Sequence, residues 1–532
     1  MSPWWKGAAV YQIYVRSFYD ADGDGQGDLA GVLAKLDYVQ GLGVDAIWLS
    51  PIHPSPDRDW GYDVADFDSV HPDYGTLADF QALLAECHAR GLKLILDEVL
   101  SHTSDEHPWF AASRDQGPDG EKAEWYVWAD PHPDGTAPNN WLSVFGGPAW
   151  SYQPARRQHY HHKFLRQQPK LNWRAPGARE AALAVLDTWL ARGVDGFRLD
   201  VAGTYLHDAD LTDNPAVPVD QRTPAQWGHA SDLQRHVNDA NLPENVEMLD
   251  LIRRRVEAFG DRFVFGEFFE EPERSGAYLP PDQGLHSGYA FELLHAEVLT
   301  PALMRDHAAR MEAHPGHWPS IAFSNHDIVR TATRFGSVSP RISFALLCAL
   351  RGNPLIYQGE ELGLPQAALT RRQLRDPVGD LYWPTVRGRD GCRTPMPWRA
   401  DAPNLGFSDG APWLPAAPEH AGLTVAAQED DADSMLAFSR RAIAARRSSS
   451  ALRLGEMSLL RADGGVVAFL RETDEEQVLC AFNLGAEAES VDDSRLIGAS
   501  VLLTYGAAAL DGAELRLDAQ AFAWVTLPRA NT

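Results

Sequence analysis

Four acidic residues stand at the ends of short, mostly apolar segments that are typical of buried strands. They are Asp97 in LILDEV, Asp200 in GFRLDV, Glu267 in FVFGEF and Asp327 in FSNHD. A single acid at the end of a strand is most often a helix cap or one half of an ion pair. Four acids gathered at one edge of a sheet would repel one another, so such a cluster indicates a use for it.

A basic residue lies close in the chain to three of these acids. The three basic residues are His102, Arg198 and His326. Paired carboxylates in a pocket without a redox cofactor suggest cleavage of a glycosidic bond. In that reaction one acid protonates the leaving oxygen and the other attacks the anomeric carbon. Aromatic rings such as those of Trp60, Tyr62 and Phe145 would then stack on the face of a sugar. The chain has 17 tryptophans, a high number; surplus tryptophans usually lie in the core, but they also suit flat stacking surfaces for sugars or bases.

The elements that must position these acids alternate between strand and helix. At least seven β-branched segments before residue 360 are followed by helical periodicity, beginning with AAVYQIYVRSF and VDAIWLS. Parallel strands joined by helices form either a doubly wound sheet or an eight-stranded barrel. No GxGxxG follows the first strand, and polar residues crowd the carboxyl ends of the strands. Both features favour an α/β fold of the (β/α)8 TIM-barrel type.

Two segments depart from this alternation. Residues 101–172 are rich in Trp, Pro, Gly and His and are too long for an ordinary connection, which predicts a small inserted domain after the third strand. From about residue 450 the pattern changes to short alternating runs such as GGVVAFLRE and EQVLCAFNL, which predict an antiparallel β-domain. We therefore expect a catalytic barrel over 1–100 and 173–449, an inserted domain over 101–172 and a C-terminal β-domain over 450–532.

The composition of the chain argues against some classes of binding partner. The chain has 532 residues and a net charge of −27, which repels nucleic acids and anionic membranes. It contains no apolar run long enough to span a bilayer, and the N-terminus lacks the pattern of a signal peptide. The four cysteines are scattered without metal-ligand spacing, as in a reducing compartment. We expect a cytoplasmic protein with no nucleic-acid or membrane partner, either a monomer or a homodimer.

The acidic motifs resemble those of a known family. DEVLSH, GFRLDVA, FGEFFE and FSNHD look like the four ordered motifs of the α-amylase family, glycoside hydrolase family 13, and QQPKLN at 167–172 resembles its accessory motif. The resemblance covers nearly the whole chain and implies the barrel, the inserted domain and the β-domain. It also implies that Asp200 is the nucleophile, Glu267 the general acid/base and Asp327 a stabiliser of the transition state.

The same resemblance assigns roles to the neighbouring residues. Arg198 would keep Asp200 ionised, because a cation beside a carboxylate lowers its pKa. His102 and His326 would donate hydrogen bonds to sugar hydroxyls. Asp97 is interpreted as mainly structural.

Two further stretches, DWGYDVADF and GRDGCRTPMPW, resemble the oligo-1,6-glucosidase and α-glucosidase branch of the family. In that branch an acid matching Asp59 pairs with an arginine matching Arg393, and the pair grips the non-reducing glucose. Tyr62 would stack beneath this glucose and Phe145 would line the same pocket. HVNDANLPENVEML, after the fourth strand, also resembles this branch and would wall the acceptor side. Such a closed pocket implies cleavage from the chain end and short substrates.

The segment DADGDGQGD at residues 20–28 predicts a divalent cation. Its acids occupy positions of a calcium-loop pattern, but Gly31 replaces the bidentate Glu and a strand precedes the loop, which excludes an EF-hand. The α-glucosidase branch places Ca²⁺ or Mg²⁺ in this loop. The residues expected to hold this single structural ion are Asp20, Asp22, Asp24, Gln26 and Asp28. The alternative is a hydrated acidic turn.

One departure from the family concerns a different ion. Ser101 stands where the family usually has an Asn that helps to hold calcium between the barrel and the inserted domain. We therefore expect that second ion to be absent.

The sequence predicts a retaining, exo-acting α-glucosidase for short α-glucosides, with transglucosylation and no organic cofactor. Expected substrates are disaccharides, small oligosaccharides and aryl or alkyl glucosides. The alternative within the class is mainly a transglucosylase or a sucrose-acting glucosyltransferase or isomerase. The hypothesis of a non-catalytic, transporter-associated protein is disfavoured, because all three acids of the catalytic trio are present. The linkage stays open, although Val201 after the nucleophile is, in the resembling branch, associated with α-1,6 cleavage.

Overall fold

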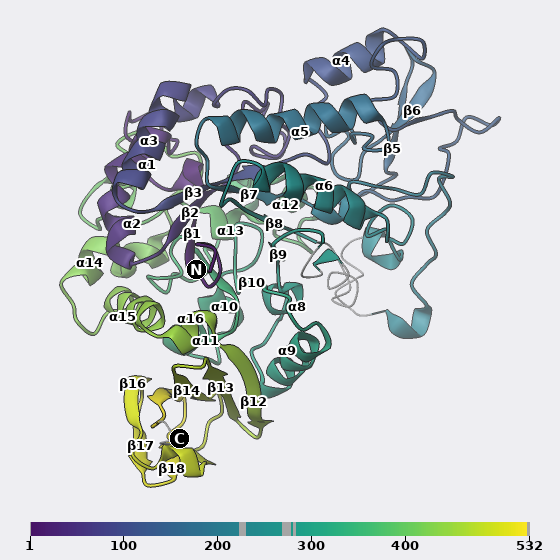
Figure 1. The fold of residues 1–532 in the computed structure, drawn as a ribbon. Coiled ribbons are helices and arrows are strands. Elements are labelled where there is room, and N and C mark those ends of the chain that lie inside the picture. Colours follow the sequence, from purple (N-terminus) through teal and green to yellow (C-terminus); the bar gives the residue numbers. More distant parts are fainter. Residues whose placement is uncertain (1, 223–229, 269–277, 280–282, 529–532) are drawn as a thin grey trace.

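The computed structural model describes residues 2–222, 230–268, 278–279 and 283–528, and Figure 1 shows its fold. Its centre is a sheet of eight parallel strands. These are β1 (Val10–Ile13), β2 (Ala46–Leu49), β3 (Lys93–Glu98), β7 (Gly196–Leu199), β8 (Phe263–Gly266), β9 (Ser287–Gly288), β10 (Ser320–Ile321) and β11 (Asn353–Tyr357). Each long strand is buried on both faces, as the apolar runs in the sequence require.

The sheet closes on itself. Its strands follow the order β10-β11-β1-β2-β3-β7-β8-β9, and a parallel bridge between Tyr289 and Ser320 joins the two edges. This confirms the predicted (β/α)8 barrel. Seven of the strands coincide with predicted segments. The eighth, β9, is only two residues long, so it carries no alternating pattern that the sequence could reveal.

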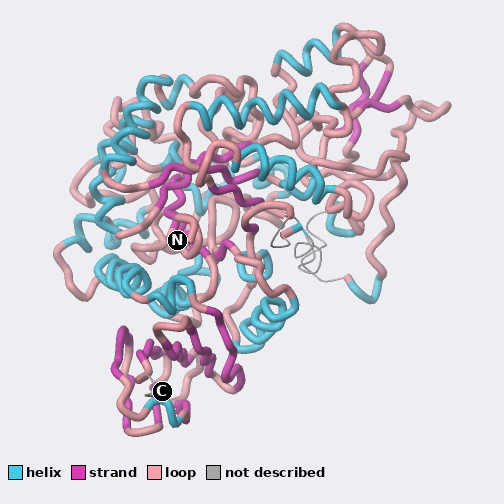
Figure 2. The backbone as a smooth tube through the Cα atoms, viewed as in Figure 1, coloured by secondary structure: helices cyan, strands magenta, loops and turns pink. Residues whose placement is uncertain are grey.

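Helices surround the strands, as Figure 2 shows. The helices that pack around the barrel are α1 (Leu29–Ala34), α2 (Leu36–Leu42), α3 (Leu77–Ala89), α5 (Pro176–Ala191), α6 (Asn245–Glu257), α8 (Phe291–Leu294), α9 (Pro301–Ala313), α10 (Thr331–Arg334), α11 (Pro340–Ala349) and α15 (Met435–Ser448). The helical spacing of the apolar residues from Leu29 to Leu42 predicts one helix, but this helix is divided at Lys35, and Gly43 ends it with φ 85°. Helix α3 begins with a capping box between Thr76 and Asp79.

The segment between β3 and β7 forms a small three-stranded sheet of its own. It contains α4 (Pro108–Asp115), β4 (Trp128–Ala129), β5 (Trp150–Gln153) and β6 (Gln158–His161), with β6 in the middle. Aromatic rings hold it together: Phe110 lies parallel to Trp128, with ring centres 5.7 Å apart. Four of its residues, Val144, Phe145, Phe164 and Gln168, line the cavity described below.

The chain ends in two antiparallel sheets, of five and three strands. The strands are β12 (Glu456–Asp463), β13 (Val466–Glu472), β14 (Gln477–Asn483), β15 (Glu489–Asp492), β16 (Ser500–Tyr505), β17 (Ala508–Asp511), β18 (Glu514–Leu517) and β19 (Ala521–Thr526). They lie at the bottom of Figure 1, away from the inserted unit. Helices α14 (Val425–Glu429), α15 and α16 (Ser450–Leu454) connect them to the barrel. No helix among the described residues is long and apolar enough to cross a membrane.

Candidate active site

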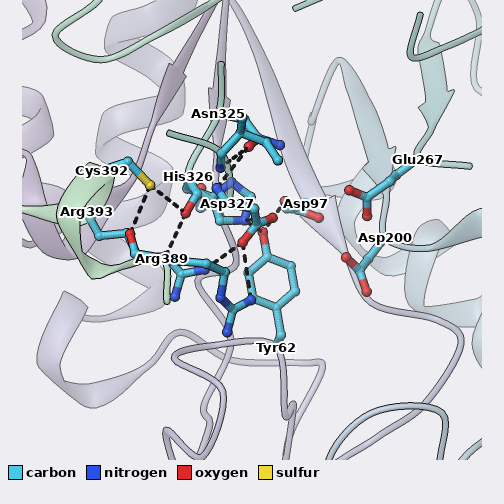
Figure 3. Close-up of polar contacts among 12 residues, drawn as sticks. Tyr62, Asp97, Asp200, Glu267, Asn325, His326, Asp327, Arg389, Cys392 and Arg393 are labelled. Carbon is cyan, nitrogen blue, oxygen red and sulfur yellow. Dashed lines mark hydrogen bonds and ion pairs between the residues drawn. The ribbon is translucent and has the colours of Figure 1, made fainter. Parts of the chain in front are cut away.

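Three acids converge at the carboxyl ends of the barrel strands, as Figure 3 shows. Asp200 directly follows β7, Glu267 directly follows β8, and Asp327 lies in the loop after β10. The main-chain nitrogen of Asp200 donates to Glu98 O and that of Glu267 to Leu199 O, each at 3.0 Å. Because these bonds continue the barrel ladder, the two side chains are presented from rigid backbone.

One guanidinium group joins the acids of neighbouring strands. Arg198 Nη1 donates to Asp200 Oδ1 and to Asp97 Oδ1, both at 2.8 Å, while Nη2 lies 2.7 Å from Glu267 Oε2. The contact with Glu267 is an ion pair by distance, without the alignment of a hydrogen bond. Asp200 and Glu267 therefore lie next to each other across a single buried cation, with Asp97 behind them.

Burial has the largest effect on the pKa values of Asp200 and Glu267. It raises the pKa of Asp200 to about 7 and that of Glu267 to about 7, although the charge of Arg198 opposes the rise in both cases. The charge of Asp200 also raises the pKa of Glu267, and the charge of Asp97 raises that of Asp200. The pair therefore favours a state with one proton. Because Asp200 accepts an aligned hydrogen bond from Arg198 and Glu267 does not, we assign the charge to Asp200 and the proton to Glu267.

Asp327 has the opposite electrostatic environment. Its Oδ1 lies 2.6 Å from Arg393 Nη2 and 3.2 Å from Arg389 Nη1. Burial alone would raise the pKa of Asp327, but His326, Arg389 and Arg393 outweigh it and hold that pKa well below its usual range. At neutral pH the two arginines are charged, whereas His326 is neutral because burial lowers its pKa to about 3. Asp327 is thus a permanent anion beside the other two acids.

A chain of hydrogen bonds fixes the ring of Tyr62 between these acids. Gln12 Nε2 donates to His326 Nδ1 at 2.8 Å, so the proton of His326 lies on Nε2. That nitrogen lies 2.5 Å from the hydroxyl of Tyr62, which donates to Asp97 Oδ2 at 3.1 Å. The rings of Tyr62 and His326 are parallel, with an interplanar angle of 1°. Tyr62 therefore presents its ring in one orientation.

A cavity lies over these side chains. Of the predicted site residues, those that line it are Asp59, Tyr62, His102, Phe145, Asp200, Val201, Glu267 and Asp327. Three predicted residues, Arg198, His326 and Arg393, are completely buried and lie behind its wall. His102 is neutral, since burial lowers its pKa to about 4, and its Nε2 donates to the carbonyl of Tyr62 at 2.9 Å.

The ion pair predicted for the end of the pocket has a different partner. Asp59 Oδ1 lies 2.6 Å from Arg389 Nη2, and the expected pairing with Arg393 is wrong. Arg393 instead donates to His326 O at 2.7 Å and binds Asp327. Arg393 is the last residue of α13 (Asp390–Arg393), and Arg389 directly precedes this helix. The two arginines are therefore about one helical turn apart. Only the first of them faces the cavity.

The sequence analysis missed several residues of the cavity. Gln168, whose Nε2 donates to Asp59 Oδ2 at 3.1 Å, belongs to the accessory motif QQPKLN and was therefore within reach of motif reasoning. Arg389 stands in GRDGCR, four residues before the arginine that was chosen. Phe291 and His295 line the cavity from α8, which no motif marks. Phe269 and Glu270 of the FGEFFE motif lie outside the described residues.

Val201 has an unusual backbone conformation. Its φ of 40° and ψ of 45° place a β-branched residue in the left-handed region, directly after Asp200. Its side chain is buried with Phe145 and Phe164 and forms part of the cavity wall. Such strain is stored mainly at functional sites, where the surrounding structure imposes it.

The acidic loop after β1 gathers some of the predicted ligands. One carboxylate oxygen each of Asp20, Asp22 and Asp28 lie within 4.8 Å of one another, a spacing that suits a divalent cation. Asp24 lies outside this group and accepts a hydrogen bond from Gln26 N at 2.7 Å. The side chain of Gln26 binds Asp73 and Arg16, so its main-chain carbonyl is the remaining ligand it offers.

A buried pair of acids in the wall of a cavity, at the carboxyl face of a (β/α)8 barrel, fits a glycoside hydrolase site. The family model for the α-amylase catalytic domain matches residues 12–455. The chain belongs to the α-amylase family, and it is an enzyme of the α-glucosidase and oligo-1,6-glucosidase branch.

Relatives of known name agree with this placement. The chain is 46% identical over 500 residues to a probable alpha-glucosidase of Rhizobium meliloti (strain 1021), covering 91% of this chain and 90% of that protein. It is 34% identical to an oligo-1,6-glucosidase of Heyndrickxia coagulans, covering 92% and 94%.

Two solved structures share the whole fold. The alpha-glucosyl transfer enzyme XgtA superposes with a TM-score of 0.94 at 44% identity, over 99% of this chain and 100% of that chain. The trehalulose synthase MutB from Pseudomonas mesoacidophila MX-45 superposes with a TM-score of 0.88 at 32% identity, over the same shares.

Proposed function

We propose that the protein is a retaining, exo-acting α-glucosidase that removes terminal glucose from short α-glucosides. The observation that carries this proposal is the pairing of Asp59 with Arg389 in the wall of the cavity that also contains Asp200 and Glu267. A charged wall behind one sugar leaves no room for a chain to continue. Binding therefore starts at the non-reducing end.

In the first step the Asp200 carboxylate attacks the anomeric carbon while Glu267 gives its proton to the leaving oxygen. The glycosidic bond breaks, the aglycone leaves as a neutral alcohol, and an ester bond joins glucose to Asp200. Asp327 faces the positive charge that develops on the ring, and its pKa keeps it ionised throughout. Tyr62 offers its fixed ring to the apolar face of the sugar.

In the second step Glu267, now a carboxylate, takes a proton from water. The water oxygen attacks the anomeric carbon, the ester bond breaks, and Asp200 returns as a carboxylate. An alcohol in place of water gives a new glucoside by the same movements. Transglucosylation therefore needs no further residue, only an acceptor that occupies the site before water does.

A second candidate is an enzyme that mainly transfers glucose or isomerises sucrose. The likeness to XgtA, titled an alpha-glucosyl transfer enzyme, and to MutB, titled a trehalulose synthase, favours it. The two candidates share the glucosyl-enzyme and differ in what attacks it. The ratio of new glucoside to free glucose separates them.

We further propose one structural Ca²⁺ or Mg²⁺ ion in the loop after β1. Asp20, Asp22 and Asp28 would hold it, and its role would be to stabilise the fold, since the loop supplies no group to the cavity. All four cysteines are buried free thiols, which supports a reducing, cytoplasmic location. The assembly is proposed to be a monomer or a homodimer.

Hydrolysis of 4-nitrophenyl α-glucoside, followed by NMR, tests the function. A retaining enzyme releases α-glucose first, and β-glucose as the first product would contradict the mechanism. Products from sucrose, maltose, isomaltose, nigerose and trehalose then give the linkage and the transfer ratio. Release of internal fragments from a long glucan would contradict exo action.

A further inference from the structure

Three carboxylates surround the guanidinium of Arg389. Nη2 lies 2.6 Å from Asp59 Oδ1 and 2.8 Å from Asp376 Oδ1, while Nη1 lies 3.2 Å from Asp327 Oδ1. Asp59 and Asp327 face the cavity and are expected to touch the sugar. The third acid, Asp376, was not singled out by the sequence.

Asp376 lies behind the cavity wall. Its side chain has no exposed surface, and it holds Arg389 through both oxygens, because Nε also donates to Oδ2 at 3.1 Å. A bidentate contact of this kind fixes the plane of a guanidinium as well as its position. Asp376 stays ionised, since Arg389 outweighs burial and lowers its pKa.

Two Arg-Asp dipeptides clasp each other at this point of the chain. The main-chain nitrogen of Arg389 donates to Asp376 Oδ2 at 2.6 Å. Asp390 Oδ2 in turn accepts from the nitrogens of Arg375 and Asp376, at 2.6 and 2.8 Å. The clasp closes a loop that includes α12 (Pro377–Tyr382) and brings Val378, Val386 and Gly388 to the cavity wall.

We propose that Asp376 is the positioning residue for the closed end of the pocket. It holds the Arg389 guanidinium where that group contacts both Asp59 and Asp327. In this way it determines how tightly the terminal glucose is bound. The proposal rests on the function proposed above. It follows from the sharing of Nη2 between Asp59 and Asp376: without the rear acid, the guanidinium is held only by the two acids that must also bind sugar.

The alternative is that Asp376 only closes the loop and caps α12, to which its Oδ1 contributes by accepting from Val378 N at 3.2 Å. That role predicts lower thermal stability with unchanged kinetic constants. A positioning role predicts weaker binding at the closed end while the chemistry at Asp200 and Glu267 is preserved. Kinetics therefore distinguish the two.

The test compares Asp376→Asn with Asp380→Asn, a control in α12 whose side chain is exposed and pairs with Arg371 at 3.5 Å. For Asp376→Asn we expect KM for 4-nitrophenyl α-glucoside to rise about tenfold, as for a lost charged hydrogen bond. The inhibition constant of glucose should rise in parallel, and kcat should change less than about threefold. Asp380→Asn should match the wild type. An unchanged KM and glucose inhibition in Asp376→Asn would overturn the proposal.

A double-mutant cycle asks whether Asp376 acts through Arg389. In an Arg389→Ala background, Asp376→Asn should have no further effect on KM, whereas independent effects would multiply and contradict the proposal. Failure of the function itself is a separate result: the wild type would then not hydrolyse α-glucosides. In that case a crystal structure of Asp376→Asn decides, since an Arg389 that still lies within 3 Å of Asp59 overturns the positioning role.

Discussion

The carboxylate of Glu267 lies 3.4 Å from the main-chain nitrogen of Val201, the residue that directly follows Asp200. The proposed acid and the proposed nucleophile are therefore connected through a single strained peptide as well as through Arg198. Movement of the turn after β7 would alter both groups at once. This relationship explains why the site needs rigid backbone on both strands.

Asp200→Asn and Glu267→Gln should each nearly abolish turnover of 4-nitrophenyl α-glucoside while the fold is retained. The first removes the attacking carboxylate and the second removes the proton shuttle, which alone contributes about 10²- to 10⁴-fold. Circular dichroism should show the wild-type spectrum. A crystal structure should place the two carboxyl groups about 5 to 5.5 Å apart, the spacing for retention. Substantial residual turnover in Asp200→Asn would contradict its role as nucleophile.

The buried acids predict a pH-dependent contribution to stability. Burial raises the pKa of Asp97, Asp200 and Glu267 to about 7 each, so the folded state binds protons more readily than the unfolded chain. Their favourable contribution is complete below about pH 4 and is lost as the pH rises through about 7. Asp327, whose pKa is lowered, contributes in the opposite sense: its stabilisation is present at neutral pH and is lost under acid conditions.

Removing one of these acids should therefore change the pH profile of Tm. Relative to the wild type, Glu267→Gln should gain stability between pH 5 and pH 8, on the order of 1 kcal/mol or more, because the variant lacks the proton that Glu267 loses over this range and one pKa unit corresponds to about 1.4 kcal/mol. The exposed substitution Asp380→Asn serves as the control. A constant difference in Tm between Glu267→Gln and the wild type over this range would be inconsistent with the raised pKa.

The sequence predicted most of the barrel because strand and helix periodicities repeat along it. It could not predict β9, whose two residues are held in place by their neighbours β8 and β10 rather than by any local pattern. Similarly, the helix predicted over 29–42 is interrupted at Lys35, where the apolar face continues without a Gly or Pro to mark the break. Long-range packing decides such cases.

Site residues, too, could be predicted where a local motif marks them, but not where long-range packing alone brings them together. Asp59, Tyr62 and Phe145 were found because they belong to recognisable motifs, and all three line the cavity. The expected pairing of Asp59 with Arg393 was wrong because a motif identifies a segment, whereas the direction of each side chain depends on how α13 is oriented. Asp376 carries no motif at all, and its role emerges only from contacts made across thirteen residues of loop.

Chelation should lower the Tm of the wild type, because an ion that binds only the folded state stabilises it by RT ln(1 + [L]/Kd). Asp22→Ala should abolish this response and retain activity, since Asp22 is exposed and does not line the cavity. Asp24→Ala should keep the response, because Asp24 lies outside the group of three carboxylates. A wild-type Tm that is unchanged by exhaustive EDTA treatment and by added Ca²⁺ or Mg²⁺ would refute the ion.

The last prediction concerns the preferred linkage. Val201 forms part of the cavity wall and packs with Phe145 and Phe164. Threonine has nearly the same shape and the same aversion to the left-handed backbone, so Val201→Thr exchanges one methyl for a hydroxyl without a change in strain. A polar group at this point alters the angle and the hydration of a departing sugar.

We expect the wild type to use isomaltose, or another disaccharide without an α-1,4 bond, at least as well as maltose. Val201→Thr should shift kcat/KM towards maltose by about 10-fold or less, the effect of a small change in a pocket. Val201→Gly is the matched control, because it relieves the strain at φ 40° and also removes the Val201 side chain from the cavity wall. It should accept both disaccharides with little preference. An isomaltose-to-maltose ratio that is the same in all three proteins would mean that Val201 only packs against its neighbours and does not set the linkage.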